Sequence, residues 1–323
     1  MTEPALRIRN LTTTFGHKGK AVTAVDDISF DVLPGEVLGL VGESGSGKSV
    51  TLRSILRLMP QGAAVNGEVL WQGRDLIRLP EREMRAVRGG QISMIFQEPS
   101  TALNPVLPVR VQIEENLRAH TRLDATERAE RCLELMDLVG IPDARRRVAQ
   151  YPHQFSGGMR QRVMIAIALA SNPRLLLADE PTTALDVTIQ DQILKLILDL
   201  RDELKMSVVF VTHDLGVVAA TCDRMAVMYA GRIVEMGPVT QVFARPQHAY
   251  TKGLLGSVPR SGTERTPLLS IEGTPPGLMH RPTGCAFHPR CPLVTDRCRA
   301  ETPSLVPLAP GHDAACFHPG ETG

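Results

Sequence analysis

Apolar and polar residues alternate near the start of the chain, as they do in a half-buried β-strand. Leu6 and Ile8 alternate with arginines, and residues 28–32 (ISFDV) repeat the pattern. Residues 36–41 (EVLGLV) instead form an almost continuous apolar run, which is typical of a strand buried on both faces. A glycine-rich loop and a helix-like run over residues 49–58 follow. This order of strand, loop and helix predicts an α/β fold.

The middle of the chain is predicted to be helical from about residue 105 to 170. Residues 127–139 (ERAERCLELMDLV) carry apolar side chains at close to a 3.6-residue period, and the glycine and proline that follow end the helix. Two more buried-strand runs come later, at residues 175–178 (LLLA) and 208–211 (VVFV). The sequence therefore predicts a sheet interrupted by a helical insertion.

The composition of the chain changes near Pro259. Beyond it Pro, Gly, Thr and Cys dominate and the hydrophobic periodicity disappears. We therefore expect two units: residues 1–255, with a helical subdomain at about 105–170, and a Cys-rich C-terminal extension over 256–323. A length of 323 residues agrees with two domains at roughly 150 residues each.

Composition and charge exclude several classes of protein. Hydrophobic residues make up 43% and charged residues 22%, which is ordinary for a globular chain and unlike a disordered one. A net charge of +1 and 4% aromatic residues argue against a nucleic-acid partner. No apolar run approaches the roughly 20 residues of a membrane helix, and the N-terminus lacks a signal-peptide core. We expect a protein that stays in the cytosol unless a partner holds it at a membrane.

Residues 42–49 (GESGSGKS) match the phosphate-loop pattern G-x-x-x-x-G-K-[ST] at every fixed position. Glycines let the backbone wrap phosphates with its N–H groups inward, and the following helix points its positive dipole end at the same charge. Lys48 can reach the β- and γ-phosphates, and Ser49 can ligate Mg²⁺. A Gly/Ser turn without a ligand is the alternative, which the flanking strand and helix disfavour. The residues expected to bind nucleotide are Gly42, Ser44, Gly45, Ser46, Gly47, Lys48 and Ser49.

A later apolar strand ends in two acids, Asp179 and Glu180. Nucleotides bind at the carboxyl ends of strands in open α/β sheets. Asp179 is therefore expected to hold Mg²⁺ through water, and Glu180 to polarise an attacking water as a general base. Residues 155–162 (FSGGMRQR) open another helix, where Ser and Gly N–H groups can bind an anion or simply cap the helix.

These motifs, in this order, resemble the ATP-binding subunit of an ABC transporter. Family members carry an LSGGQ signature, and this chain departs from it at Phe155 and Met159. The resemblance covers residues 1 to about 255. It implies a P-loop ATPase fold of the α/β class, with a mixed sheet core and a helical subdomain, and hydrolysis of ATP with Mg²⁺.

The resemblance also implies roles for three residues outside these motifs. Phe15 would stack on the adenine, where many relatives have Tyr. Gln97 would contact Mg²⁺ and the attacking water, and would sense the membrane partner. His213 would hold the γ-phosphate and the catalytic geometry. Core packing for Phe15 and helix capping for His213 are the alternatives.

The signature would act on a second subunit. Ser156, Gly157 and Gly158 would bind the γ-phosphate of ATP held by that subunit, and Asp186 would lie at the dimer seam. Closure of the pair on two ATP molecules would drive two membrane permeases from inward-facing to outward-facing, and hydrolysis would reopen it. The implied partners are a related second ABC ATPase (or a copy of this chain), two permeases and, indirectly, an external binding protein. The implied location is peripheral, at the cytoplasmic face of the inner membrane.

Two segments indicate the transporter subclass. Residues 96–105 (FQEPSTALNP) and 247–251 (QHAYT) resemble ATPases that energise import of oligopeptides and dipeptides, although Ala249 replaces the usual Pro. A nickel or glutathione importer is the alternative. A DNA-maintenance ABC ATPase is a more distant one, because it would need a coiled coil or zinc module where only 106 residues separate Ser49 from Ser156.

Four of the six cysteines lie in the last 39 residues, at Cys285, Cys291, Cys298 and Cys316. In a cytosolic chain such a cluster indicates a metal site more than disulfides. Four thiolates suit zinc or an iron–sulfur cluster, but structural zinc favours tighter C-x2–4-C spacings. The resemblance to peptide importers implies a [4Fe–4S] cluster, with Zn²⁺ as the alternative. Cys132 and Cys222 are expected in the core.

Overall fold

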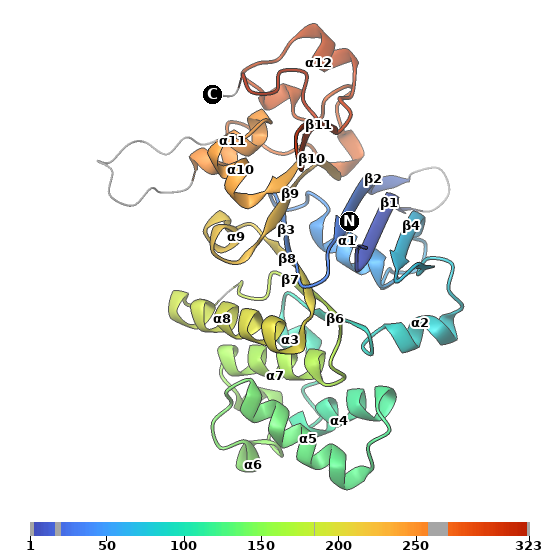
Figure 1. The fold of residues 1–323 in the computed structure, drawn as a ribbon, viewed down its shortest axis with the longest axis vertical. Coiled ribbons are helices and arrows are strands. Elements are labelled where there is room, and N and C mark those ends of the chain that lie inside the picture. The colour runs from blue at the N-terminus through green and yellow to red at the C-terminus, as the bar shows by residue number, and fades with distance from the viewer. Residues whose placement is uncertain (1–2, 17–20, 184, 258–270, 322–323) are drawn as a thin grey trace.

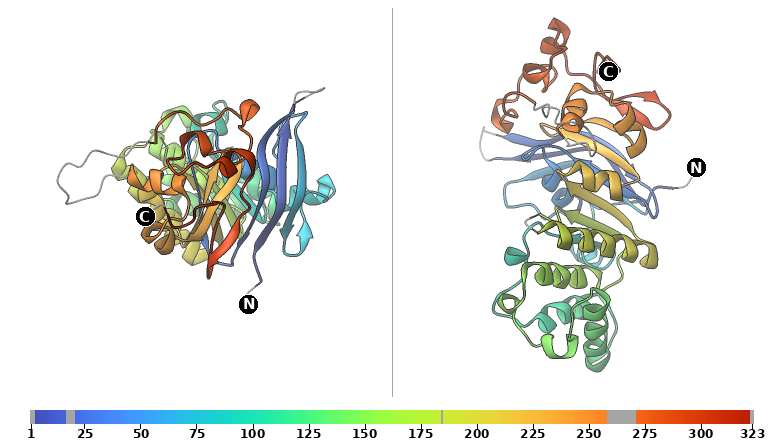
Figure 2. Two further views of the ribbon diagram at one scale, coloured as in Figure 1. Left: turned by 90° about the horizontal axis from the view of Figure 1, so that it is seen from above. Right: turned by 90° about the vertical axis from the view of Figure 1, so that its left-hand side faces the viewer.

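In the computed structural model, β-sheets occupy the middle of the molecule, a helical part lies at one end and the C-terminal segment at the other (Figure 1). The structure describes residues 3–16, 21–183, 185–257 and 271–321. The right-hand view of Figure 2 shows the same division from the side.

The larger sheet has eight strands and is built around β3 (Val37–Val41). All five residues of β3 are buried, because parallel neighbours and covering layers leave neither face to solvent. The order is β11-β12-β10-β9-β3-β8-β7-β6, and the first three strands run antiparallel to their neighbours. The strands are β6 (Ile92–Ile95), β7 (Leu175–Asp179), β8 (Ser207–Thr212), β9 (Arg224–Tyr229), β10 (Arg232–Pro238), β11 (Val306–Ala309) and β12 (His312–Ala314).

The smaller sheet is antiparallel and carries the predicted N-terminal strands. Its order is β2 (Val22–Val32), β1 (Leu6–Phe15), β4 (Ala64–Trp71) and β5 (Arg74–Asp75). In the left view of Figure 2 these blue strands form a layer beside the main body. Helix α1 (Lys48–Ile55) contacts β1, β2 and β7, so the helix after the phosphate loop lies between the two sheets.

The helical part confirms the helical prediction for the middle of the chain. It contains α4 (Val109–His120), α5 (Ala125–Leu138), α6 (Ala144–Arg147) and α7 (Gly157–Leu169). Asp124 and Glu127 form a capping box at the start of α5, which satisfies N–H groups that a helix end leaves free. The predicted apolar face of α5 buries Cys132, Leu135 and Met136.

The segment after residue 271 joins the larger sheet, because β12 pairs with β10 and β11 pairs with β12. The boundary near residue 255 stays a prediction; Pro259 lies outside the described residues. Cys222 is half-buried and Cys132 fully buried. The remaining elements are α2 (Glu81–Val87), α3 (Pro99–Ala102), η1 (Pro152–Gln154), α8 (Val187–Leu204), α9 (Leu215–Thr221), α10 (Val239–Ala244), α11 (Ala249–Gly256), η2 (Leu278–His280), η3 (His288–Arg290) and α12 (Asp296–Ala300).

A buried carboxylate joins β12 to the main body. Glu235 on β10 is fully buried, and its oxygens accept the N–H groups of Gln247 (2.7 Å) and His248 (2.9 Å). Nε2 of His312, at the start of β12, lies 2.8 Å from the same carboxylate. This network fixes the start of α11 and the strand β12 against one residue of β10, since a buried carboxylate must keep its partners.

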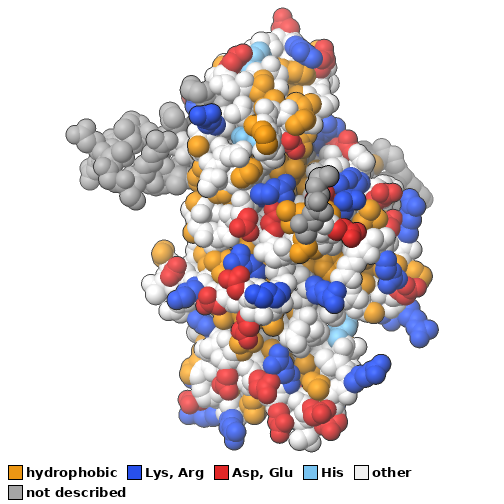
Figure 3. All heavy atoms as spheres, in the orientation of Figure 1, with side chains coloured by type: hydrophobic (Ala, Val, Ile, Leu, Met, Phe, Trp, Pro, Cys, Tyr) orange, Lys and Arg blue, Asp and Glu red, His pale blue; other side chains and the backbone are white. Residues whose placement is uncertain are grey.

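The face of the molecule drawn in Figure 3 shows no strong separation of charge. Lys and Arg side chains are intermingled with Asp and Glu over the face seen in Figure 3. Among the described residues, no helix combines the length and the hydrophobicity that crossing a bilayer requires.

Candidate functional site

The phosphate loop leaves β3 and leads directly into α1. Gly42 has φ +152° and Gly47 has φ +106°, and neighbouring backbone crowds both. A Cβ at Gly42 would lie 2.2 Å from the carbonyl oxygen of Met228, and one at Gly47 would lie 2.6 Å from that of Ala24. Glycine is therefore required at both positions. The tip of the loop, residues 44–45, is exposed and free to meet a ligand.

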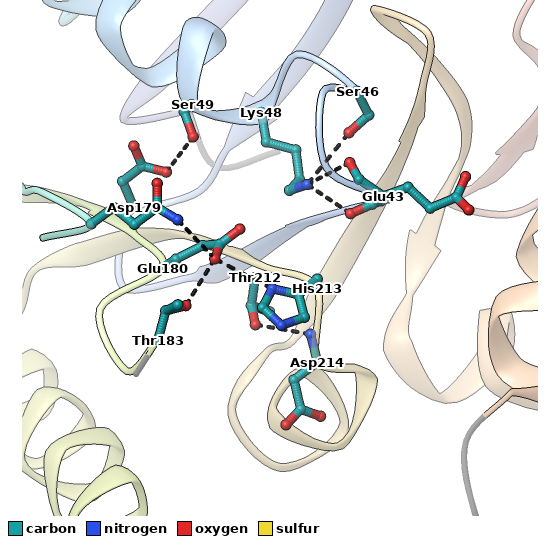
Figure 4. A network of polar contacts seen from close by, with 12 residues as sticks. Glu43, Ser46, Lys48, Ser49, Asp179, Glu180, Thr183, Thr212, His213 and Asp214 are labelled. Atoms are coloured by element: carbon teal, nitrogen blue, oxygen red, sulfur yellow. Dashed lines mark hydrogen bonds and ion pairs between the residues drawn. The ribbon is translucent and has the colours of Figure 1, made fainter. Parts of the chain in front are cut away.

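Lys48 folds back over the loop that precedes it (Figure 4). Its ammonium is buried and donates to the carbonyl oxygens of Gly42 (2.6 Å) and Glu43 (2.9 Å). Burial lowers the pKa of Lys48, while the charges of Glu180, Asp179 and Glu43 oppose that shift. Because only oxygens of the loop itself hold it, the Ser46 hydroxyl at 3.5 Å included, the ammonium can exchange them for phosphate oxygens without leaving its place.

Asp179 lies at the end of β7, two strands from the phosphate loop, and is fully buried. Its Oδ1 accepts the hydroxyl of Ser49 at 2.7 Å, whereas Oδ2 is buried without a hydrogen-bond partner (Figure 4). Burial raises the pKa of Asp179, and the hydrogen bond from Ser49 opposes the rise. A hydroxyl beside an unpaired carboxylate oxygen is a donor set that fits Mg²⁺.

Side chains from three segments contact one carboxylate oxygen of Glu180, Oε2 (Figure 4). Gln97 donates its amide at 3.3 Å, Thr183 donates its hydroxyl at 2.8 Å, and Nδ1 of His213 lies 3.3 Å away. Glu180 also has φ +45°, a strained conformation for a residue with a side chain, which is common at functional sites. The sequence predicted Gln97 and His213 but missed Thr183, because no spacing rule distinguishes it from other threonines.

Two predicted residues, Ser156 and Asp186, cap helices in this structure. The hydroxyl of Ser156 accepts the N–H three residues on, and Asp186 does the same for α8. Asp214 caps α9 with two such bonds, so His213 does not cap that helix. The capping alternative that we raised for His213 is therefore wrong, while Ser156 and Asp186 show the capping contact.

The signature and the phosphate loop lie in different parts of the chain's fold. Helix α7 packs against α3, α4, α5 and β6, whereas α1 packs against β1, β2 and β7. Ser156 and Gly157 are exposed, and Gly158 is half-buried beside α8, where a Cβ would lie 2.8 Å from Cγ2 of Ile189. Phe15 is half-buried at the end of β1 and pairs with β2. The structure thus brings together Lys48 with the two acids, but not the signature.

The four C-terminal cysteines are free thiols and neighbours. Burial and the charges of the other three raise the pKa of Cys285 to about 11. Backbone N–H groups two residues on donate to Cys285, Cys291 and Cys316. Such N–H···S bonds favour thiolates and tune iron–sulfur sites. As these side chains stand, the described residues contain no group of three or more His, Cys, Asp or Glu arranged to hold a metal ion.

Two family models match the chain. The model for ABC transporter matches residues 25–183, and that for oligopeptide/dipeptide transporter, C-terminal region, matches residues 234–298. A probable peptide ABC transporter ATP-binding protein of Sinorhizobium fredii is 53% identical over 319 residues, 98% of this chain and 95% of the relative. The chain belongs to the ABC transporter family. This ABC transporter chain is also 48% identical to the oligopeptide transport ATP-binding protein OppD of Salmonella typhimurium, over 98% of this chain and 94% of that protein.

Solved structures agree with the fold of this ABC transporter chain. The ATP-binding cassette MJ0796, described as a dimer in a post-hydrolysis state bound to ADP and phosphate, superposes with a TM-score of 0.65 at 31% identity. The match covers 72% of this chain and 98% of MJ0796. The predicted fold class, a P-loop ABC ATPase with a mixed sheet and a helical subdomain, is confirmed.

Proposed function

We propose that this ABC ATPase powers the import of dipeptides and oligopeptides through a pair of membrane permeases. One observation carries the proposal. The phosphate loop, Asp179 and Glu180 meet at the carboxyl ends of β3 and β7, in a chain whose C-terminal region matches the oligopeptide/dipeptide transporter model. The relatives from Sinorhizobium fredii and Salmonella typhimurium are named for peptide transport. Import of nickel or glutathione is the alternative, because the subclass resemblance of residues 96–105 and 247–251 extends to those groups.

The loop binds the phosphates of ATP through its N–H groups and Lys48. On binding, Lys48 exchanges the carbonyl oxygens of Gly42 and Glu43 for phosphate oxygens, so the cation stays satisfied throughout. Ser49 and the unpaired Oδ2 of Asp179 would hold Mg²⁺, which neutralises phosphate charge when it is bound. Phe15 would stack on the adenine.

Glu180 acts as the general base toward a water that attacks the γ-phosphate. Contacts from Gln97, Thr183 and His213 hold its carboxylate in one orientation, which reduces the entropy lost when the water is aligned. The proton of the water passes to the Glu180 carboxylate as the water oxygen bonds to the γ-phosphorus, and the bond from that phosphorus to the bridging oxygen breaks, so that ADP leaves with that oxygen. Gln97 is the member of this group that would sense the membrane partner.

A second ATPase subunit completes the site. Helix α7 packs on other elements than α1 within one chain, which supports a role for Ser156, Gly157 and Gly158 at an ATP molecule held by another subunit. The dimeric state of MJ0796 supports this arrangement, with Asp186 at the seam. We propose that its partners are a related, heterologous second subunit, two membrane permeases and, indirectly, an external binding protein, and that this chain lies at the cytoplasmic face of the inner membrane.

The C-terminal thiols would hold a [4Fe–4S] cluster. Four free cysteines that lie together, three of them accepting backbone N–H groups, fit such a cluster in their chemistry. Bound iron would stabilise the thiolates that otherwise repel one another. We expect anaerobically purified protein to contain about four iron atoms and four sulfides per chain. One zinc per chain would instead favour the Zn²⁺ alternative. The metal content of Cys285→Ser is compared with that of the matched control, Cys222→Ser.

The transport proposal is tested in the reconstituted complex. A dipeptide with its binding protein is expected to stimulate ATP hydrolysis, and Glu180→Gln to abolish the stimulation while ATP still binds. Glu203→Gln, an exposed acid on α8, is the matched control. Stimulation by nickel or by glutathione in place of the peptide would overturn the peptide assignment.

A further inference from the structure

The C-terminal segment forms an ion pair with the phosphate loop through Arg290. Arg290, the last residue of η3, donates both terminal nitrogens to the carboxylate of Glu43, at 2.8 and 3.0 Å. Glu43 is the second residue of the phosphate loop. The two residues lie 247 positions apart in the sequence, so this contact joins the last part of the chain to the nucleotide site.

Every polar group of Glu43 has a partner. Its N–H donates to the hydroxyl of Tyr250 on α11 at 2.8 Å, and its carbonyl oxygen accepts Lys48 at 2.9 Å. Its side chain points away from Lys48, toward the C-terminal segment (Figure 4). Arg290 therefore binds the side chain of the same residue whose carbonyl oxygen accepts a hydrogen bond from Lys48.

Arg290 is anchored more firmly than a surface arginine. Its side chain is 5% exposed, and its guanidinium lies 5.9 Å from the ring centre of Tyr229 and 6.0 Å from that of Phe287. A two-pronged pair between Arg and a carboxylate, stacked on aromatic rings, fixes geometry in a way that Lys cannot reproduce. The position of Glu43 is thus set by the C-terminal segment.

Two of the cysteines lie close to the same short turn. Phe287 precedes η3 and Cys291 follows it, and the N–H of Phe287 donates to the thiol of Cys285. Phe287 also packs on Tyr250, with ring centres 5.4 Å apart. Arg290 is thus joined to Cys291 by the next peptide bond and to Cys285 through Phe287.

We propose that Arg290 is a positioning residue for ATP binding, which holds Glu43, cancels its charge beside the phosphates and couples the C-terminal thiol region to the phosphate loop. The proposal rests on the assignment of this loop as the ATP site. Without Arg290, the carboxylate of Glu43 would repel the incoming phosphates and no longer fix the loop. Because coupling between two sites is reciprocal, ATP binding must in turn change the surroundings of Cys285 and Cys291.

Binding of a non-hydrolysable ATP analogue with Mg²⁺ to the full chain, measured by calorimetry, tests the charge argument. We expect Arg290→Gln to weaken binding about tenfold, about 1.4 kcal/mol, and to raise KM for ATP more than it lowers kcat. The double variant of Arg290→Gln with Glu43→Gln is expected to recover most of the affinity, since it removes the charge together with its partner. Arg299→Gln is the matched control, because this exposed arginine pairs with Asp296 in the same segment.

Two results would overturn the proposal: Arg290→Gln within twofold of the Arg299→Gln control, or a double variant that binds no better than Arg290→Gln. If Arg290→Gln does not fold, Arg290→Lys replaces it and is expected to lie between the two, because it keeps the charge and loses the two-pronged geometry. Lys48→Ala distinguishes a failure of the proposed ATP site from a failure of the proposed role of Arg290. If that variant binds ATP normally, the proposed function fails; if it loses binding while Arg290→Gln matches the control, only this inference fails.

Hydrogen exchange of the full chain tests the coupling. Adding the analogue is expected to change exchange of the amides at residues 285–291, and the double variant is expected to lose this change while keeping the response of the phosphate loop. Unchanged exchange at residues 285–291 in the native chain would contradict the coupling.

Discussion

His248 caps α11 from a buried position, and its replacement by Asn is expected to alter how stability depends on pH. The side chain is 2% exposed, and its Nδ1 accepts the N–H of Tyr250 at 3.0 Å. The backbone N–H of His248 donates to the buried carboxylate of Glu235, and the centre of its ring lies 5.7 Å from that of the Phe287 ring. Asn can supply a cap acceptor at this position but does not titrate, so His248→Asn removes the proton-binding group and keeps the capping chemistry.

The size of the effect follows from the shift in pKa. Burial lowers the pKa of His248 from 6.5 to about 4. Between these values the unfolded chain binds a proton that the folded chain does not, so stability falls as the pH falls. The stabilising contribution is complete above pH 6.5 and is lost toward pH 4. At about 1.36 kcal/mol per unit, roughly 2.5 kcal/mol is lost between pH 7.5 and 4.5.

Urea unfolding followed by circular dichroism measures this difference directly. Native protein is expected to lose about 2.5 kcal/mol more than His248→Asn over that pH interval. The smaller Asn side chain costs stability at every pH, and this offset cancels when each protein is compared with itself. His280→Asn, at an exposed position, is the control and should follow the native curve. Equal pH slopes for native protein and His248→Asn would refute the reasoning.

Three further changes test the site and its support. Glu180→Gln is expected to lower kcat by about 10²–10⁴ while ATP binding persists, since it removes only the general base; loss of binding in a calorimetric titration would contradict this role. Asp179→Asn should raise the Mg²⁺ concentration for half-maximal hydrolysis at least about tenfold, because it removes the charge from the unpaired oxygen, and an unchanged Mg²⁺ curve would argue against the assignment. Glu235→Gln puts a donor where three donors converge and should lower the free energy of unfolding by about 1–3 kcal/mol, with earlier hydrogen exchange in β12. A native-like urea midpoint would show that the network contributes little.

The local pattern of apolar residues was sufficient to predict several helices and strands. The apolar period of residues 127–139 predicted α5, and the continuous apolar runs predicted β3, β7 and β8, because burial on both faces requires such runs. The secondary structure of the Cys-rich extension was harder to predict. Its composition masked two strands, and β12 joins the larger sheet only through pairing with β10.

In the candidate site too, the sequence predicted some residues and only the structure identified another. The acids after β7 and the glycines of the phosphate loop were predictable, since backbone geometry and strand ends demand those residue types. Thr183 was missed, although its hydroxyl makes the shortest contact to Glu180. A single threonine carries no spacing signal, so only its position next to the carboxylate identifies it.

By itself, the sequence determined the nucleotide chemistry of this protein, because a phosphate loop, a strand-terminal acid pair and a helix-opening signature are local patterns set by backbone geometry. The tertiary structure alone decided which of these groups meet within one chain. It brought Lys48, Asp179 and Glu180 together, placed the signature helix on other elements than the phosphate-loop helix and set Arg290 against Glu43. Contacts between residues far apart in the chain depend on how layers pack, and no local spacing encodes them.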